Sequence, residues 1–145
     1  GAFPYFSGRS EEKGADDGLG FNLNLTLPEH IDAALYMQTL ERALRKIESF
    51  QPSFLVVCLG FDIAKGDPTG TWPLLAADFA ALGAAIAHLR RPCLIVQEGG
   101  YRQRSLGSNA RAFFTGLADS QRGAIASVRP AAKPSAGATS SLGGG

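Results

Sequence analysis

Two side chains with catalytic potential directly follow two short apolar runs of the chain. Asp62 lies in GFDIAKGDPTG, after FLVVCLG, and Tyr101 lies in EGGY, after CLIVQ. A carboxylate can ligate a metal or act as an acid or base, and a phenol can donate a hydrogen bond to an oxyanion. In open α/β sheets the ligand site lies beyond the carboxyl ends of the strands. We therefore expect Asp62 and Tyr101 to approach a common crevice.

Ordinary structural roles compete with these catalytic ones. A lone Asp after a buried strand commonly caps a helix or forms a turn, and Asp67 before Pro68 is typical of a turn acid. A lone Tyr after two glycines is often a packed surface aromatic. Gly99 and Gly100 themselves let the backbone approach a ligand closely or adopt positive φ.

Three segments are expected to form the strands that position these residues. Residues 21–27 alternate apolar and polar side chains, which predicts a half-buried strand. Residues 54–60 and 93–97 are continuous apolar runs, typical of strands covered on both faces. Three strands are few for a parallel sheet, so the chain is either a very small domain or the end of a larger one.

Helices are expected between and after the strands. Apolar residues recur at three- and four-residue steps from Asp32, a first-turn acid, to Phe50, and helices also fit residues 76–90 and 106–117. The last would bury Ala110, Phe113, Phe114 and Leu117. Strands alternating with helices predict an α/β fold, a parallel sheet flanked by helices.

Composition places the chain among globular proteins of one domain. It has 145 residues, 45% of them hydrophobic, with a formal net charge of +1. This balance predicts no direct nucleic-acid partner and no membrane partner, and without a membrane-length apolar run we expect a cytoplasmic protein. Cys58 and Cys93 lie in apolar runs and are expected to be small buried hydrophobes. Residues 1–122 are expected to form the domain, and residues 123–145, rich in Ala, Gly, Ser and Pro, a disordered tail.

Three longer segments together resemble a known family. They are GLGFNLNLTLP, FQPSFLVVCLGFDIAKGDPTG and PCLIVQEGGYRQRSLGSNARAFFTGL. In this order they resemble the C-terminal portion of the histone deacetylase and acetylpolyamine amidohydrolase superfamily, over about residues 3–118. Within this superfamily, the sequence of these segments looks closest to the bacterial acetylpolyamine and class II branch. The resemblance implies the C-terminal portion of an arginase/deacetylase-like three-layer fold, with a zinc ion at the strand ends.

The resemblance also implies roles for individual residues. It assigns Asp62 to the zinc ion and Tyr101 to polarising the acetyl carbonyl and stabilising the oxyanion. Gly99 and Gly100 would line the acyl channel, and Thr69 would contribute to its wall. The substrate would be a small acetylated amine or acetyl-lysine.

Much of the family's catalytic equipment has no counterpart in this chain. The family takes its other zinc ligands from an Asp-x-His segment and its base from a His-His segment, both upstream of the matched region. His30 and His88 lie in neither motif and are expected to have structural or solvent roles. Arg9 and Asp16 also depart from the family pattern, where His and Gly are usual. We expect the isolated chain to be inactive as a zinc-dependent deacetylase.

Two other classes of function remain open at this point. The chain could be a non-catalytic half-domain, a binding or assembly module that pairs with a missing N-terminal half or with a second copy of itself. A nucleotide-binding fold is disfavoured because Gly18-Leu19-Gly20 precedes a predicted strand instead of following one.

Overall fold

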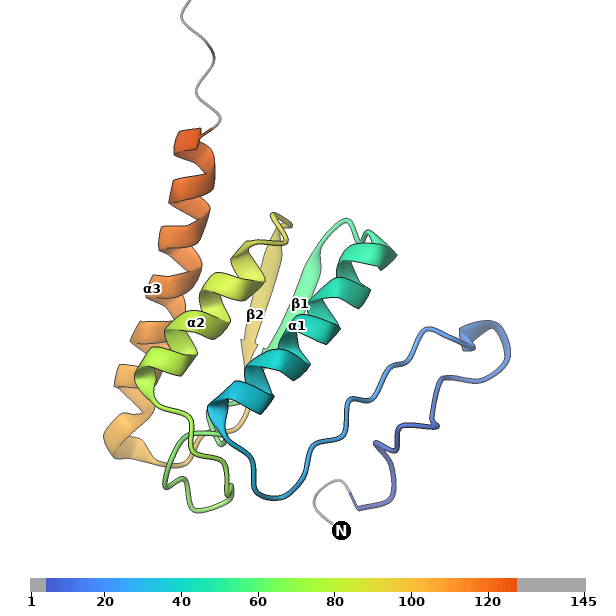
Figure 1. The fold of residues 1–145 in the computed structure, drawn as a ribbon, viewed down its shortest axis with the longest axis horizontal. Helices are drawn as coiled ribbons and strands as arrows, with labels where there is room; N and C mark the ends of the chain where they lie inside the picture. The colour runs from blue at the N-terminus through green and yellow to red at the C-terminus, as the bar shows by residue number, and fades with distance from the viewer. Residues whose placement is uncertain (1–4, 128–145) are drawn as a thin grey trace, which may run out of the picture.

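The computed structural model describes residues 5–127, and the side chains of residues 5–122. Its elements are a short 3-10 turn, η1 (Asp16–Gly18), three helices and two strands. In chain order these are α1 (Ala33–Phe50), β1 (Leu55–Leu59), α2 (Ala76–Ala87), β2 (Cys93–Gln97) and α3 (Gln103–Ser127), as Figure 1 shows. None of these helices is long and apolar enough to cross a membrane.

The two strands pair in parallel, with Leu55 opposite Cys93 and Leu59 opposite Gln97. Helix α2 forms the crossover between them, as parallel strands require. Helices α1 and α2 lie along one side of the sheet, and α3 packs beside α2 (Figure 1). The expected α/β fold, a parallel sheet flanked by helices, is therefore confirmed.

The core lies between the sheet and the helices. Alternate residues of β1 point toward it, so Leu59 is buried while Val56 is 55% exposed, and Leu94 on β2 is 60% exposed. The expectation that both faces of the strands are covered is wrong for the described residues, because their helices cover one face only. The buried apolar cluster comprises Leu59, Phe61, Ala64, Leu74, Phe79, Leu82, Ala87, Phe113 and Leu117.

The open face also explains the cysteines. Cys58 shares the outward side of β1 with Val56 and is exposed, and Cys93 is only partly buried. Both thiols are free, and neither is the fully buried hydrophobe that the apolar runs predicted.

The strand predicted at residues 21–27 does not form. The segment has no regular secondary structure and lies in the arm that runs outward before α1 (Figure 1). Its amide side chains bind a loop instead: Asn22 donates to the backbone oxygen of Glu12 at 2.5 Å, and Asn24 donates to that of Arg9 at 2.8 Å. A strand needs a hydrogen-bonded neighbour, and the described sheet offers this segment none.

Helices α1 and α2 begin and end close to their predicted positions, whereas α3 extends well beyond the predicted residues 106–117. Asp32 caps α1 from just outside, its carboxylate accepting from the Leu35 N–H at 2.7 Å, and is therefore not a first-turn residue. Helix α2 ends three residues earlier than predicted, at Ala87. Phe114, predicted to be buried, is 47% exposed. Helix α3 continues to Ser127, past the predicted domain boundary, and the rest of the predicted tail lies outside the described residues.

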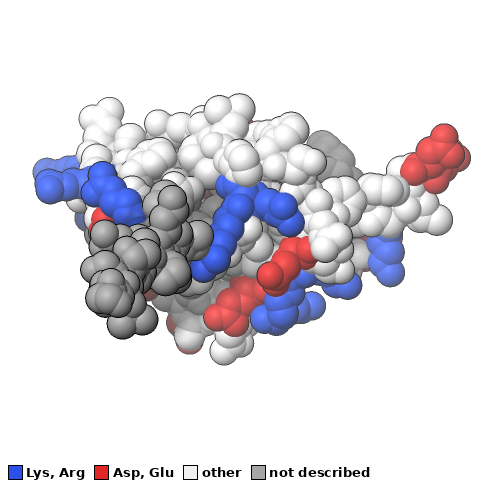
Figure 2. Space-filling model, turned by 90° about the horizontal axis from the view of Figure 1, so that it is seen from above, with Lys and Arg blue, Asp and Glu red and all other residues white. Residues whose placement is uncertain are grey.

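Basic and acidic side chains are interspersed on the face seen in Figure 2. Charges of both signs on one face give it no strong field of a single sign. Among the described residues one ion pair is present, between Arg45 and Glu41 on α1 at 3.9 Å, and both side chains are well exposed.

Candidate functional site

Asp62 lies where the carboxyl ends of both strands meet. Beyond the strands, the Phe61 N–H donates to the Gly99 carbonyl at 2.8 Å and the Glu98 N–H donates to the Leu59 carbonyl at 2.9 Å, so the two following turns remain joined. A Cβ placed on Gly60 would lie 2.6 Å from Asp62 Oδ1, and one on Gly99 would lie 2.8 Å from Asp62 Cγ. The carboxylate is therefore held against two glycine backbones that have no side chain to displace it.

The half-buried Asp62 carboxylate accepts no hydrogen bond from any described residue. Its neighbour across the core edge is Tyr36 on α1, whose pKa is raised by burial and by the negative charge of Asp62. The Tyr36 ring packs against Trp72 with centroids 5.5 Å apart, and the Trp72 indole N–H donates to the Pro28 carbonyl. Tyr36 is one of the apolar residues that recur between Asp32 and Phe50, but nothing in the sequence indicated its proximity to Asp62.

Asp67 is the most extensively hydrogen-bonded side chain at this edge. It is 4% exposed, and its Oδ1 accepts from the Thr69 N–H at 3.0 Å and the Thr69 hydroxyl at 2.8 Å. Its Oδ2 accepts from the Tyr101 N–H at 2.8 Å and the Arg102 N–H at 3.0 Å. The predicted turn role is confirmed, but the sequence carried no signal for the second pair of bonds, which cross to the turn after β2.

Tyr101 is fixed through its backbone and free at its phenol. Its side chain is 57% exposed and has no hydrogen-bond or ring partner among the described residues. The structure thus brings the backbone of Tyr101 to the same strand edge as Asp62, as expected, but no hydrogen bond in the described part of the chain joins the two side chains.

The other predicted site residues surround this edge. Gly99 lies against the Asp62 carboxylate, and Gly100, at φ +135°, packs against Phe61. Thr69 is an exposed residue whose hydroxyl is committed to Asp67. The exposed His88 lies at the end of α2 with its Nδ1 2.7 Å from the Ala84 carbonyl oxygen.

The donor set fits one ligand of a zinc ion but not a complete site. Catalytic zinc takes three protein ligands from His, Cys, Asp or Glu. Asp62 offers an uncommitted carboxylate, yet the described residues contain no cluster of three such side chains. A complete catalytic zinc site would need further donors from outside this part of the chain.

The family model and the relatives that match this chain point to the same protein family. The histone deacetylase domain matches residues 1–117. The chain is 42% identical to the acetylpolyamine amidohydrolase of Burkholderia pseudomallei over 115 residues, which are 79% of this chain and 34% of that protein. It is 39% identical to acetylpolyamine amidohydrolase 2 of Pseudomonas aeruginosa over 108 residues, 74% of this chain and 31% of that protein.

Solved structures agree with these relatives. The crystal structure of the Burkholderia pseudomallei acetylpolyamine aminohydrolase superposes with a TM-score of 0.80 at 40% identity, covering 82% of this chain and 35% of that one. The HDA15 HD domain gives a TM-score of 0.74 at 26% identity, covering 83% and 35% of the two chains. The chain therefore spans about a third of the length of the proteins it matches.

Proposed function

Because the chain belongs to the histone deacetylase family, we propose that it supplies the C-terminal portion of a zinc-dependent amidohydrolase that removes acetyl groups from acetylated amines. The substrate class is an acetylpolyamine or an acetyl-lysine side chain. The name of the Burkholderia pseudomallei relative, an acetylpolyamine amidohydrolase, supports the first of these.

One observation carries the proposal: an uncommitted carboxylate, Asp62, held between Gly60 and Gly99 at the common end of both strands. Asp62 would be one zinc ligand, and the Asp-x-His segment of an upstream portion would supply the others. A bound zinc ion would act as a Lewis acid and lower the pKa of its water. To the zinc site, this chain would contribute one ligand and the backbone that positions it.

The phenol of Tyr101 would act on the substrate directly. Its hydroxyl is free to donate a hydrogen bond to the acetyl carbonyl oxygen, on which negative charge develops as the tetrahedral intermediate forms. Since this bond strengthens as charge develops, it lowers the barrier more than it tightens substrate binding. Gly99 and Gly100 would line the acyl channel beside it, with Thr69 in the channel wall.

A second candidate function rests on the open face of the sheet. The exposed Val56 and Leu94 lie on the side of the strands that the described helices leave uncovered. An apolar sheet face of this kind favours association. In this alternative the chain is a non-catalytic module that pairs with a separate N-terminal half or with a second copy of itself.

The experiment uses a continuous chain in which an upstream portion carrying the Asp-x-His and His-His segments precedes residue 1, called here the extended chain. Acetate release is measured with N-acetylputrescine and with an acetyl-lysine peptide, and zinc content is measured on the same samples. Asp62→Ala is expected to lower zinc content and acetate release together. Asp119→Ala, an exposed carboxylate of α3, is the matched control and is expected to change neither.

Two results would overturn the proposal. One is an Asp62→Ala variant that keeps both its zinc and its activity. The other is a folded, zinc-loaded extended chain that releases acetate from neither substrate, which would favour the non-catalytic alternative.

A further inference from the structure

Asp67 joins two loops that are far apart in the sequence. Oδ1 accepts two bonds from Thr69, in its own loop, and Oδ2 accepts the N–H groups of Tyr101 and Arg102, at 2.8 and 3.0 Å, in the turn after β2. Both carboxylate oxygens are therefore filled by donors. The residue is also buried, with 4% of its surface exposed.

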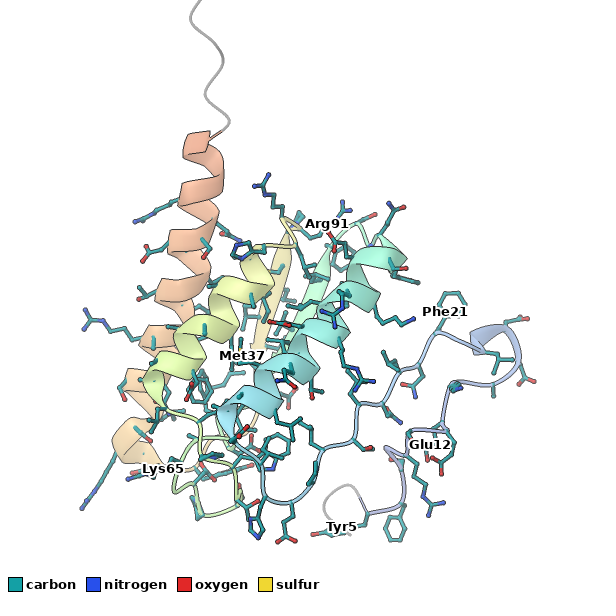
Figure 3. All side chains as sticks on the ribbon, viewed as in Figure 1. Tyr5, Glu12, Phe21, Met37, Lys65 and Arg91 are labelled. Carbon is teal, nitrogen blue, oxygen red and sulfur yellow. The ribbon has the colours of Figure 1, made fainter. Side chains whose placement is uncertain are left out.

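A second tie joins the same two loops. The Arg102 guanidinium donates to the Lys65 carbonyl, and it lies over Gly66, where a Cβ would be 3.1 Å from Cζ. Figure 3 shows Lys65 in the loop between β1 and α2, at the end of the molecule where α3 begins. The turn that carries Tyr101 is thus bound to the loop after β1 at two places, through the Asp67 carboxylate and through the Arg102 guanidinium.

The bonds to Asp67 are charge-assisted. Burial by itself raises the pKa of Asp67, but the N–H groups of Thr69, Tyr101 and Arg102 and the Thr69 hydroxyl outweigh burial, and the pKa is lowered from its usual value. The side chain is therefore ionised at neutral pH. Hydrogen bonds to an ionised acceptor are roughly twice as strong as neutral ones.

The Tyr101 side chain has no comparable anchor of its own. Its phenol has no hydrogen-bond partner among the described residues and the side chain is 57% exposed. The backbone at residue 101 therefore sets the position and direction of the Cα–Cβ bond from which the ring projects, and that backbone is bound by Asp67.

We propose that Asp67 is a positioning residue for Tyr101, which fixes the Tyr101 backbone so that the phenol meets the developing oxyanion. This inference rests on the proposed function. A displacement of about 1 Å at a reacting group can cost about 10²-fold in rate. The hydrogen bonds from the Tyr101 and Arg102 N–H groups to Asp67, called here the Asp67 clamp, would therefore contribute to kcat more than to substrate binding.

The test is a double-mutant cycle in the extended chain, with Asp67→Asn and Tyr101→Phe made singly and together. The amide of Asn can accept on one side only, so either the Thr69 donors or the Tyr101 and Arg102 N–H groups lose their acceptor. Asp67→Asn is expected to lower kcat by about 10- to 10²-fold, with KM changed by less than about threefold. In the Tyr101→Phe background the same change is expected to cost less than about threefold, because the phenol that it positions is gone.

Equal losses of kcat in both backgrounds would overturn the proposal, because a merely structural role does not depend on the phenol. Arg102→Ala gives a milder second perturbation if Asp67→Asn fails to fold, and its smaller loss of kcat is also expected to vanish without the phenol. The matched control is Arg104→Ala, which removes an exposed guanidinium with no described partner and is expected to leave kcat unchanged.

Amide hydrogen exchange separates failure of the clamp from failure of the proposed function. In Asp67→Ala, which removes both acceptor oxygens, the Tyr101 and Arg102 amides are expected to exchange at least about 10-fold faster, while those of β2 stay protected. Unchanged exchange at both amides would refute the clamp whether or not the protein releases acetate. Faster exchange with unchanged kcat in an active protein would refute positioning, and an inactive wild type would refute the proposed function on which it rests.

Discussion

Gly99→Ala should displace the proposed metal ligand, the Asp62 carboxylate, without disrupting the fold. A Cβ at this position would lie 2.8 Å from Asp62 Cγ, whereas carbon atoms in ordinary contact are about 3.5–4.0 Å apart. The carboxyl group must therefore move by about 1 Å, which far exceeds the tolerance of about 0.2 Å in a metal–ligand distance. Because Asp62 is a side chain that can rotate away, we expect the free energy of unfolding to fall by less than about 1 kcal/mol.

The assay measures zinc affinity by competition with a chelator and stability by urea unfolding, both on the extended chain. Zinc affinity is expected to fall by about 10- to 100-fold in Gly99→Ala. The neighbouring Gly100→Ala variant should lose more stability than zinc affinity. At this position the φ of +135° and a Cβ 2.8 Å from that of Phe61 strain the backbone itself. That variant is expected to lose about 2 kcal/mol or more of stability.

Gly107→Ala on α3 is the control, since nothing lies within 4 Å of its Cβ position. It should bind zinc normally and gain up to about 1 kcal/mol from helix propensity. A Gly99→Ala protein with unchanged zinc affinity would refute the placement of Asp62 as a ligand. A loss of stability as large as that of Gly100→Ala would show that Asp62 cannot rotate as reasoned.

Three further outcomes are expected. Gly83→Ala should lower the free energy of unfolding by about 1–3 kcal/mol, because its Cβ would collide with the Phe113 carbonyl where α2 crosses α3; an unchanged melting temperature would contradict this packing. The isolated chain should bind no stoichiometric zinc at sub-micromolar concentration in equilibrium dialysis, and one zinc per chain that is lost in Asp62→Ala would show a complete site. Because the pKa of Asp67 is lowered in the folded state, its ionised form stabilises the protein above the unfolded pKa of about 3.9, and this stability is lost as pH falls through the folded value. The stability difference between wild type and Asp67→Asn should therefore shrink from pH 7 to pH 3 in urea titrations, and a difference independent of pH would contradict it.

The elements that depend on local sequence could be predicted from it. The continuous apolar runs predicted β1 and β2, and the stripe from Ala33 to Phe50 predicted α1, because these patterns report directly which residues face a core. Asp62 and Tyr101 follow these strands in the chain. They could be placed at one edge of the sheet because parallel strands bring their carboxyl ends together.

Features that depend on a distant partner could not be predicted. The alternation at residues 21–27 reports two faces but not whether a neighbouring strand exists, and Asn22 and Asn24 bind a loop instead. The apolar run of β1 likewise does not show which face the described helices leave open, so Cys58 was wrongly placed in the core. Asp67 lies 34 residues from Tyr101, and an Asp-Pro turn pattern carries no information about a contact at that separation.

Tyr101→Phe in the zinc-loaded extended chain tests most directly whether this chain contributes to deacetylation. The variant removes one hydroxyl that has no described partner, so it should leave the fold and the zinc content unchanged. We predict that kcat for acetate release falls by about 10² to 10³-fold while KM changes by less than about threefold. Full kcat in a zinc-loaded Tyr101→Phe protein would contradict the oxyanion role and make Tyr101 a surface aromatic after a glycine turn.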